Sequence, residues 1–370
     1  MSIAFLDPHA SYLEIKDEID AAYHQVMDSG TYILGEAVEN FENDYAEYCN
    51  ARHCIGIASG LDALLLSLRA LDIGEGDEVI VPSHTFFATW LAVSQAGATP
   101  IAVEPDIATY NIDPARIEAA ISPRTRAIIP VHLYGHPADL GSIVEIAKRH
   151  GLYVIEDAAQ AHGAQYKGQR IGAHGDAVCW SFYPGKNLGA YGDGGAITTD
   201  NAKIAEKLSV LRNYGSHAKY QNEILGYNSR LDPLQAAMLQ VKLRHINRWN
   251  EHRKTVAQLY SEILAETSLK LPNVPNWADP AWHLYVIRHP QRDALQDFLA
   301  QKGVGTLIHY PIPPHRQKAY ALTDLAQKSF PIAEQCSREV LSLPMGPHLS
   351  VKDTHTVANH IIAFLDQNPK

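Results

Sequence analysis

Six short apolar segments recur between residues 50 and 200, and they constrain the fold more than any other feature of the chain. They lie at residues 78–82, 100–105, 127–131, 153–157, 178–182 and 196–199. Each is nearly continuous in apolar character, as expected for a strand that is covered on both faces. Helical patterns, such as that of 139–150, lie between many of them. The alternation predicts an α/β domain with a mostly parallel sheet, in which ligands gather at the carboxyl ends of the strands.

A different pattern follows Asp232. The stretch 232–266 has the spacing of one long helix, with Asp232 as its predicted cap and Pro233 in its first turn. Its apolar residues form two stripes, which predicts burial on more than one side and a place between domains or near a subunit contact. A chain of 370 residues suits one large and one smaller domain. We therefore expect a large domain over 1–245 and a small one over 246–370.

Composition excludes several classes of function. The formal net charge of −10 disfavours a nucleic-acid-binding protein. No apolar run is long enough to span a membrane, and the first residues lack the pattern of a signal peptide, so we expect a cytoplasmic protein. The four cysteines form no CxxC pair, and the 19 histidines include no HExxH motif. Free buried thiols and no metal site are the expectation.

The segment "SFYPGKNLGAYGDGGA" (181–196) places one cation, Lys186, among five glycines. Glycines allow a backbone to approach a ligand closely. A lysine in such a loop can clamp a phosphate, act as a Schiff-base nucleophile, or lie on the surface. The P-loop alternative fails, because Asn187 follows the lysine where Ser or Thr is needed and Trp180 stands where the first glycine belongs.

Three further signals each have a functional and a structural interpretation. Asp157 ends an apolar strand, where it can keep a pyridine nitrogen protonated or cap a following helix. Ser59 and Gly60 precede a predicted helix, whose N-terminus can bind a phosphate or be capped. Phe86 and Phe87 follow a strand, and either can stack on a planar ring or pack in the core.

The joint order of these signals resembles that of fold-type I pyridoxal-phosphate enzymes, and more narrowly that of the DegT/DnrJ/EryC1/StrS family. The motifs "EDAAQAHGA", "SFYPGKNLGAYGDGGAI" and "GYNSRLDPLQAA" carry the resemblance, which extends over nearly the whole chain. The resemblance implies an aspartate-aminotransferase-like α/β fold. That fold has a large cofactor-binding domain with a mostly parallel sheet and a smaller C-terminal α+β domain.

The resemblance also implies roles for single residues. Lys186 is implied to bind pyridoxal phosphate covalently and to move a proton once it is released. Asp157 is implied to pair with the pyridine nitrogen, Gln160 to approach the ring hydroxyl, and Phe86 to stack on the ring. The choice between Phe86 and Phe87 stays open from the sequence.

The phosphate of the cofactor is implied to be held by Gly60, Leu61 and Ser181. Many family members carry Thr where Leu61 stands, so only the backbone N–H of Leu61 can serve here. Asn228 is implied to reach the phosphate from a partner subunit, which implies a homodimer with shared active sites.

The implied reaction moves an amino group from L-glutamate to a ketosugar nucleotide, with pyridoxamine phosphate formed between the two half-reactions. Stretches such as "FFATWLAV" and "GTLIHYPIPPH" resemble enzymes that convert a dTDP-3-keto-6-deoxyhexose into a dTDP-3-amino-3,6-dideoxyhexose. Candidate substrate contacts are Tyr183, Lys219, His309 and Tyr310. A 4-keto or UDP-linked 3-keto acceptor, a lyase or desulfurase, and a non-catalytic regulator with the same fold are the alternatives. The gluco or galacto configuration of the sugar is left open.

Overall fold

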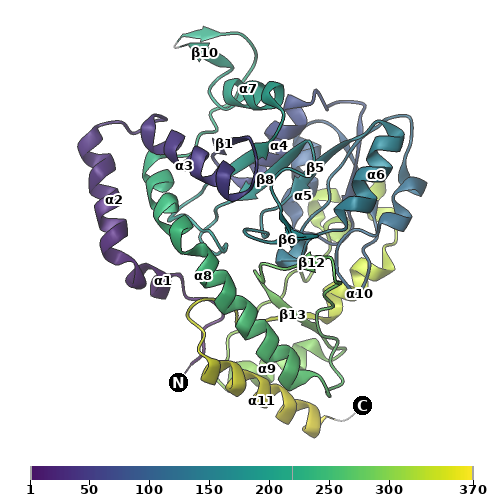
Figure 1. Cartoon of the computed structure of the whole chain (residues 1–370). Helices are drawn as coiled ribbons and strands as arrows, with labels where there is room; N and C mark the ends of the chain where they lie inside the picture. Colours follow the sequence, from purple (N-terminus) through teal and green to yellow (C-terminus); the bar gives the residue numbers. More distant parts are fainter. Residues whose placement is uncertain (1, 219, 369–370) are drawn as a thin grey trace.

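The computed structural model describes residues 2–218 and 220–368, and its large domain is built on a seven-stranded sheet with the order β1-β9-β8-β5-β4-β2-β3 (Figure 1). The pairs from β3 to β8 are parallel, whereas β9 runs antiparallel to both β8 and β1. The expected mostly parallel sheet is confirmed, with every predicted strand present. The strands are β1 His53–Ile57, β2 Glu78–Pro82, β3 Thr99–Val103, β4 Thr125–Ile128, β5 Tyr153–Asp157, β8 Ala177–Ser181 and β9 Gly195–Thr199.

Both faces of this sheet are covered by helices, which is why the strands lack polar alternation. In β2, Val79 and Val81 belong to one apolar cluster and Ile80 to another on the opposite face. One face packs on α4 Gly60–Ala70, α5 Phe87–Gln95 and α7 Ala202–Leu211. The other packs on α3 Glu36–Tyr48, α6 Leu140–His150 and the start of α8.

Helix α8 (Pro233–Leu264) runs from the large domain into the small one, as Figure 1 shows. Pro233 is its first residue, as expected. The predicted side-chain cap is wrong: Asp232 makes no such hydrogen bond, because its carboxylate is exposed to solvent. Its backbone carbonyl instead accepts the first helical hydrogen bond, from the N–H of Ala236. In the described part of the chain, no helix is both long and apolar enough to cross a membrane.

The small domain is built around the antiparallel pair β13 (Tyr285–Arg288) and β14 (Val340–Leu343). The C-terminal half of α8 packs there with α9 (Arg292–Gln301) and α11 (Val351–Gln367) in one apolar cluster. The N-terminal end of the chain joins this domain, since Ile3 pairs with Val304. The expected small α+β domain is therefore confirmed, while the exact boundary at 245/246 stays a prediction.

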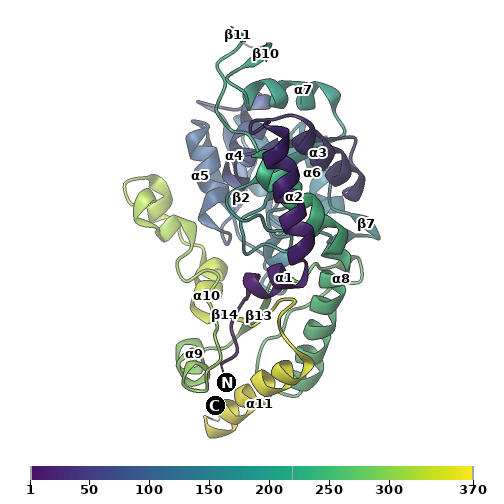
Figure 2. The ribbon, with the colours of Figure 1, turned by 90° about the vertical axis from the view of Figure 1, so that its left-hand side faces the viewer.

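The remaining elements are short or peripheral. Helices α1 and α2 precede α3, and the β10–β11 hairpin projects beyond α7 (Figures 1 and 2). Their bounds are α1 Pro8–Glu14, α2 Lys16–Ser29, β6 Gln165–Tyr166, β7 Gln169–Arg170, β10 Ser216–Ala218, β11 Gln221–Asn222, β12 Ala278–Asp279 and α10 Pro331–Glu339. The 3-10 helices are η1 Pro114–Arg116, η2 Glu118–Ala120, η3 Leu133–Gly135, η4 Pro314–Arg316, η5 Lys318–Tyr320 and η6 Asp324–Gln327.

One contact between the two domains is made by a carboxylate. Glu104, just after β3, accepts hydrogen bonds from the N–H groups of Ile332 (2.8 Å) and Ala333 (3.1 Å) at the start of α10. These N–H groups have no partner within their own helix, so a carboxylate satisfies them and also favours the positive end of the helix. The contact fixes the small domain against the edge of the sheet where the site lies.

Candidate active site

Asp157 is the last residue of β5, at the carboxyl end of the central sheet, and its side chain is buried. The hydroxyl of Thr89 in α5 donates to one carboxylate oxygen (2.8 Å) and the N–H of Ala159 donates to the other (3.2 Å). Burial raises the pKa of Asp157, and the Thr89 hydrogen bond opposes that shift. A buried carboxyl group with a shifted pKa at the carboxyl end of a strand is a candidate functional group.

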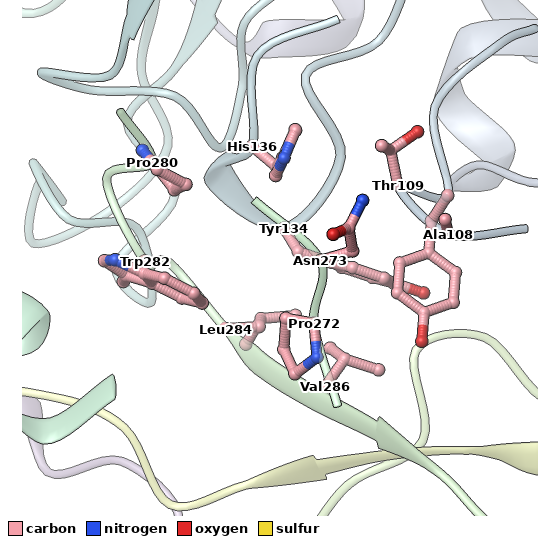
Figure 3. A pocket seen from close by; sticks show the side chains of 11 residues that line it. Ala108, Thr109, Tyr134, His136, Pro272, Asn273, Pro280, Trp282, Leu284 and Val286 are labelled. Atoms are coloured by element: carbon pink, nitrogen blue, oxygen red, sulfur yellow. The ribbon is translucent and has the colours of Figure 1, made fainter. Parts of the chain in front are cut away.

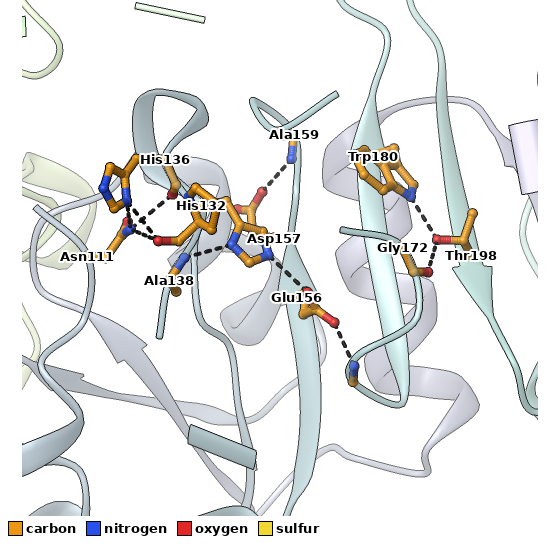
Figure 4. Close-up of polar contacts among 12 residues, drawn as sticks. Asn111, His132, His136, Ala138, Glu156, Asp157, Ala159, Gly172, Trp180 and Thr198 are labelled. Carbon is orange, nitrogen blue, oxygen red and sulfur yellow. Dashed lines mark hydrogen bonds and ion pairs between the residues drawn. The ribbon is translucent and has the colours of Figure 1, made fainter. Parts of the chain in front are cut away.

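The residue before it, Glu156, points to the opposite face of the sheet and is fully buried (Figure 4). One oxygen of Glu156 lies 3.0 Å from Nε2 of His132, and the other accepts the N–H of Gly175 (2.6 Å). Nδ1 of His132 accepts the N–H of Ala138 (3.0 Å). Because His132 also donates its backbone N–H to the carbonyl of Asp157, this network fixes the end of β5 from behind the site.

Lys186 follows β8, the strand next to β5. Burial lowers the pKa of its amine to about 8, and the nearby carboxylate of Asp157 opposes that shift. A pKa of about 8 gives the amine a sizeable neutral fraction near physiological pH, and the neutral form can attack a carbonyl carbon and carry a proton. The structure thus brings together the two residues predicted to be catalytic.

The N-terminus of α4 lies against Ser181, the last residue of β8. Ser59 caps this helix through its hydroxyl, which accepts the N–H of Asp62 (3.1 Å). Gly60 faces Ser181 so closely that a Cβ at position 60 would lie 2.6 Å from Cβ of Ser181. The N–H groups of Gly60 and Leu61 belong to the first turn, where they are free to bind an anion. These residues fit the phosphate of the expected cofactor, and the glycine is required by the close approach of the two backbones.

Three predicted residues, Gln160, Phe86 and Tyr310, gather around the place for the cofactor ring. The amide nitrogen of Gln160 donates to the hydroxyl of Tyr310 (3.0 Å), and its oxygen accepts the N–H of Tyr134 (2.6 Å). The ring of Phe86 lies 5.3 Å from that of Tyr310 and is 53% exposed. Phe87 instead packs into the core against Tyr320. Of the two phenylalanines, only Phe86 is therefore available for stacking.

The small domain contributes His309. Its Nδ1 lies 2.8 Å from the hydroxyl of Ser342, and burial together with the charge of Lys186 lowers its pKa to about 4. Tyr183, beside the lysine loop, is 61% exposed and open to a large substrate. Behind the site, a crevice between the domains is lined by Tyr134 on one side and Trp282 on the other (Figure 3).

One predicted residue, Asn228, is not part of this cluster. Asn228 is exposed, and its backbone pairs with that of Asn213. Arg230 donates to the side chain of Asn213 (2.9 Å), so it holds the Asn228 loop. Lys219 lies outside the described residues.

The sequence analysis missed Thr89 and Tyr134. Thr89 sits in α5, four residues after Thr85, and the two hydroxyls are 3.0 Å apart. Two threonines four residues apart, one just before and one within the mostly apolar α5, were the available signal. Tyr134 has φ of 62° in the loop after β4, which turns its backbone N–H toward Gln160. No local sequence pattern predicts a positive φ at a tyrosine.

Comparison with known proteins decides the family. Residues 13–362 match the DegT/DnrJ/EryC1/StrS aminotransferase family. The chain belongs to this family. A DegT/DnrJ/EryC1/StrS relative from Saccharopolyspora erythraea, "Erythromycin biosynthesis sensory transduction protein EryC1", is 55% identical over 99% of both chains. The "dTDP-3-amino-3,6-dideoxy-alpha-D-galactopyranose transaminase" of Aneurinibacillus thermoaerophilus is 54% identical over 97% of this chain and 98% of its own.

A solved structure in the family shows the same architecture. DesV of S. venezuelae, in complex with a ketimine intermediate, aligns with a TM-score of 0.96 at 51% identity, over 98% of each chain. The aspartate-aminotransferase-like fold expected from the sequence is thereby confirmed.

Proposed function

We propose that the protein is a pyridoxal-phosphate-dependent aminotransferase that moves the amino group of L-glutamate to C3 of a dTDP-3-keto-6-deoxyhexose. The product is a dTDP-3-amino-3,6-dideoxyhexose. The observation that carries the chemistry is the pairing of a buried lysine of low pKa with a buried strand-end carboxylate, Lys186 with Asp157. The transaminases at above 50% identity support the choice of sugar nucleotide. We place the reaction in the cytoplasm.

Each residue has a defined task in this proposal. When bound, pyridoxal phosphate supplies an electron sink for the carbanion formed at the amino-bearing carbon. Asp157 keeps the pyridine nitrogen protonated, and Phe86 holds one face of the ring. Lys186 binds the cofactor and, once displaced, takes the proton from the substrate carbon and returns it in the second half-reaction.

The substrate pocket is proposed to lie between the lysine loop and the small domain. Tyr183, His309 and Tyr310 border it, and Lys219 is proposed to meet the diphosphate. A neutral imidazole at His309 can accept a hydrogen bond from a sugar hydroxyl or donate one to it. A histidinium there would repel a protonated Lys186. The low pKa of His309 therefore suits the site.

The first experiment is an absorbance cycle on the purified holoenzyme. L-Glutamate should bleach the visible band of the lysine-bound cofactor, and after its removal only the right ketosugar should restore it. Recovery with a dTDP-3-keto-6-deoxyhexose, but not with 4-keto or UDP-linked sugars, is the expected result. Recovery with a 4-keto or UDP-linked sugar alone would show that the chemistry is right and the acceptor wrong. A protein without any visible band after loading would refute the proposal.

A regulatory role is the second candidate, because the relative from Saccharopolyspora erythraea is named a sensory transduction protein. A regulator that keeps only the scaffold has no need for a buried lysine and a buried carboxylate side by side, since both cost free energy to bury. Lys186 and Asp157 are both in place here. The absorbance cycle separates the candidates, since a regulator would bind the cofactor without turning over glutamate.

We further propose a homodimer in which Asn228 serves the partner's phosphate site. Between the projecting hairpin and the exposed loop of Asn228, the side chains of Ile224 and Leu225 are 41% and 96% exposed. An apolar side chain so fully exposed favours burial against another chain. Within its own chain the loop is fixed through Ser229, whose hydroxyl donates to Asp62 in α4 (2.7 Å).

Mixing two inactive variants tests this sharing. Lys186→Ala lacks the catalytic amine, and Asn228→Ala should bind the cofactor about tenfold or more weakly, because it loses a charge-assisted hydrogen bond. In a mixed dimer, the protomer that keeps Lys186 receives Asn228 from its partner. Mixing at limiting cofactor should therefore restore up to about half the wild-type activity per mixed dimer. No recovery, with mixed dimers verified by two affinity tags, would mean that Asn228 serves its own chain.

A further inference from the structure

Asn187 follows Lys186 directly, and its side chain is buried at the junction of three segments. Its Nδ2 donates to the carbonyl of Ala281 (2.8 Å) and to Oδ1 of Asn250 in α8 (2.9 Å). Its Oδ1 lies 3.3 Å from Nδ1 of His283. One amide thus connects the lysine loop to the long helix and to the segment that enters the small domain.

Two backbone carbonyls fix the orientation of this amide: that of Ala281 contacts it directly, and that of His162 acts through the side chain of Asn250. A carbonyl oxygen only accepts, so the atom of Asn187 that faces Ala281 must be the nitrogen. Asn250 donates its own Nδ2 to the carbonyl of His162 (2.8 Å), so its oxygen must face Asn187. Both hydrogens of the Asn187 amide are then used. Its oxygen can only accept, which requires the proton of a neutral His283 to be on Nδ1.

His283 is held from the other sides as well. Its carbonyl accepts from the buried guanidinium of Arg253 in α8 (3.2 Å). Its backbone lies against Gly135, where a Cβ would come within 2.8 Å of the His283 nitrogen. Gly135 also has φ of 89°, so glycine is needed here both for the space beside His283 and for the backbone conformation. The backbone of His283 is thus held on two sides, and the hydrogen bond with Asn187 orients its side chain.

The electrostatic surroundings keep His283 neutral. Burial lowers its pKa well below the usual value, and the charges of Lys186 and Arg253 lower it further, as do His309 and His162. These four groups come from the lysine loop, from α8, from the small domain and from the loop after β5. The charge of Lys186 therefore acts directly on His283, and Lys186 is also adjacent to Asn187 in the chain.

We propose that Asn187 and His283 form a positioning pair for Lys186: Asn187 holds His283 through its Nδ1 proton, and the pair fixes the backbone that carries the lysine. The inference rests on the proposed function, in which Lys186 binds the cofactor. A shift of about an ångström in a catalytic group can cost about a hundredfold in rate, so a residue that fixes this backbone has a measurable effect.

Two substitutions of the same histidine test the pair. His283→Asn keeps an N–H donor near the position of Nδ1, whereas His283→Gln keeps a polar group near Nε2 and loses the donor to Asn187. Both leave the bonds of Asn187 to Ala281 and Asn250 in place, so neither removes the junction. Asn187→Ala removes the whole junction. Asn247→Ala is the matched control, because Asn247 lies on α8, as Asn250 does, and accepts a hydrogen bond from Arg170 away from the lysine loop.

The readouts are the pH titration of the cofactor's visible band, kcat and KM, and cofactor binding by the apoprotein. We expect His283→Gln and Asn187→Ala to lower kcat about tenfold or more with KM changed less than about threefold. The same two variants should shift the pKa of the band by about one unit. His283→Asn and the control should stay within about threefold of wild type in kcat.

The outcomes separate cleanly. Equal losses of kcat in His283→Asn and His283→Gln would overturn the proposed pair. The hydrogen bond between Nδ1 of His283 and Asn187 would then not be the feature on which kcat depends. A normal band titration in His283→Gln would also overturn it. A wild-type protein with no visible band would refute the proposed function, and this inference with it.

Discussion

Replacing Lys186 with alanine should lower kcat by about 10⁴-fold or more, because one side chain both binds the cofactor and carries the proton in each half-reaction. The variant should still bind the cofactor without covalent attachment, so its visible band should shift to that of the free aldehyde. Its apoprotein should be at least as stable as wild type. The low pKa of Lys186 shows that burial disfavours its charge, and alanine removes that cost. Absorbance, kcat and thermal unfolding measure the three effects.

A second buried lysine provides the control. Lys242 in α8 also has a pKa lowered to about 8 by burial, and it belongs to the same region, since its ammonium donates to the carbonyl of Gly189 (2.6 Å). It lies 3.7 Å from the centre of the Tyr191 ring. Lys242→Met should keep the band and lose about 1–3 kcal/mol of stability, because the carbonyl loses its partner. A variant Lys186→Ala that keeps more than about a tenth of the activity would contradict the assignment.

The sequence was informative wherever one local pattern decides the structure. The strands were predictable because apolar side chains must fill both faces of a covered sheet, as Val79 and Ile80 do. Strand β1 was not predicted. Its pairing with β9 joins His53 to Thr199, and a contact of such sequence separation leaves no local signal.

The site was predictable as a set of residues but not as a geometry. Lys186 and Asp157 are visible because a lysine among glycines and a strand-end acid are rare in combination. Thr89 and His283 were missed because their importance lies in contacts across the fold, with Asp157 and with Asn187. Asp232 shows the reverse case: the local rule places the start of α8 correctly, but the side chain of Asp232 makes no capping hydrogen bond.

Replacing Asp157 with asparagine should lower kcat by about 10²–10⁴-fold while the apoprotein stays as stable as wild type. An amide cannot hold a proton on the pyridine nitrogen, so the electron sink is weakened. The fold tolerates the change, since the amide oxygen can still accept from Ala159 and its nitrogen can donate to Thr89. The Thr89 hydroxyl can then turn to donate to Thr85, which lies 3.0 Å away.

The neighbouring carboxylate should respond in the opposite way. Glu156→Gln alters the buried contact with His132 and the bond from Gly175 on the far face of β5, so it should cost about 1–3 kcal/mol of stability. Its kcat should stay within about threefold of wild type, because Glu156 does not face the cofactor. The two adjacent acids would thus be distinguished, because replacing Asp157 lowers kcat and replacing Glu156 lowers the stability measured by thermal unfolding. If Asp157→Asn instead destabilised the apoprotein and left kcat unchanged, Asp157 would be a structural residue and the pairing with Lys186 would have no catalytic meaning.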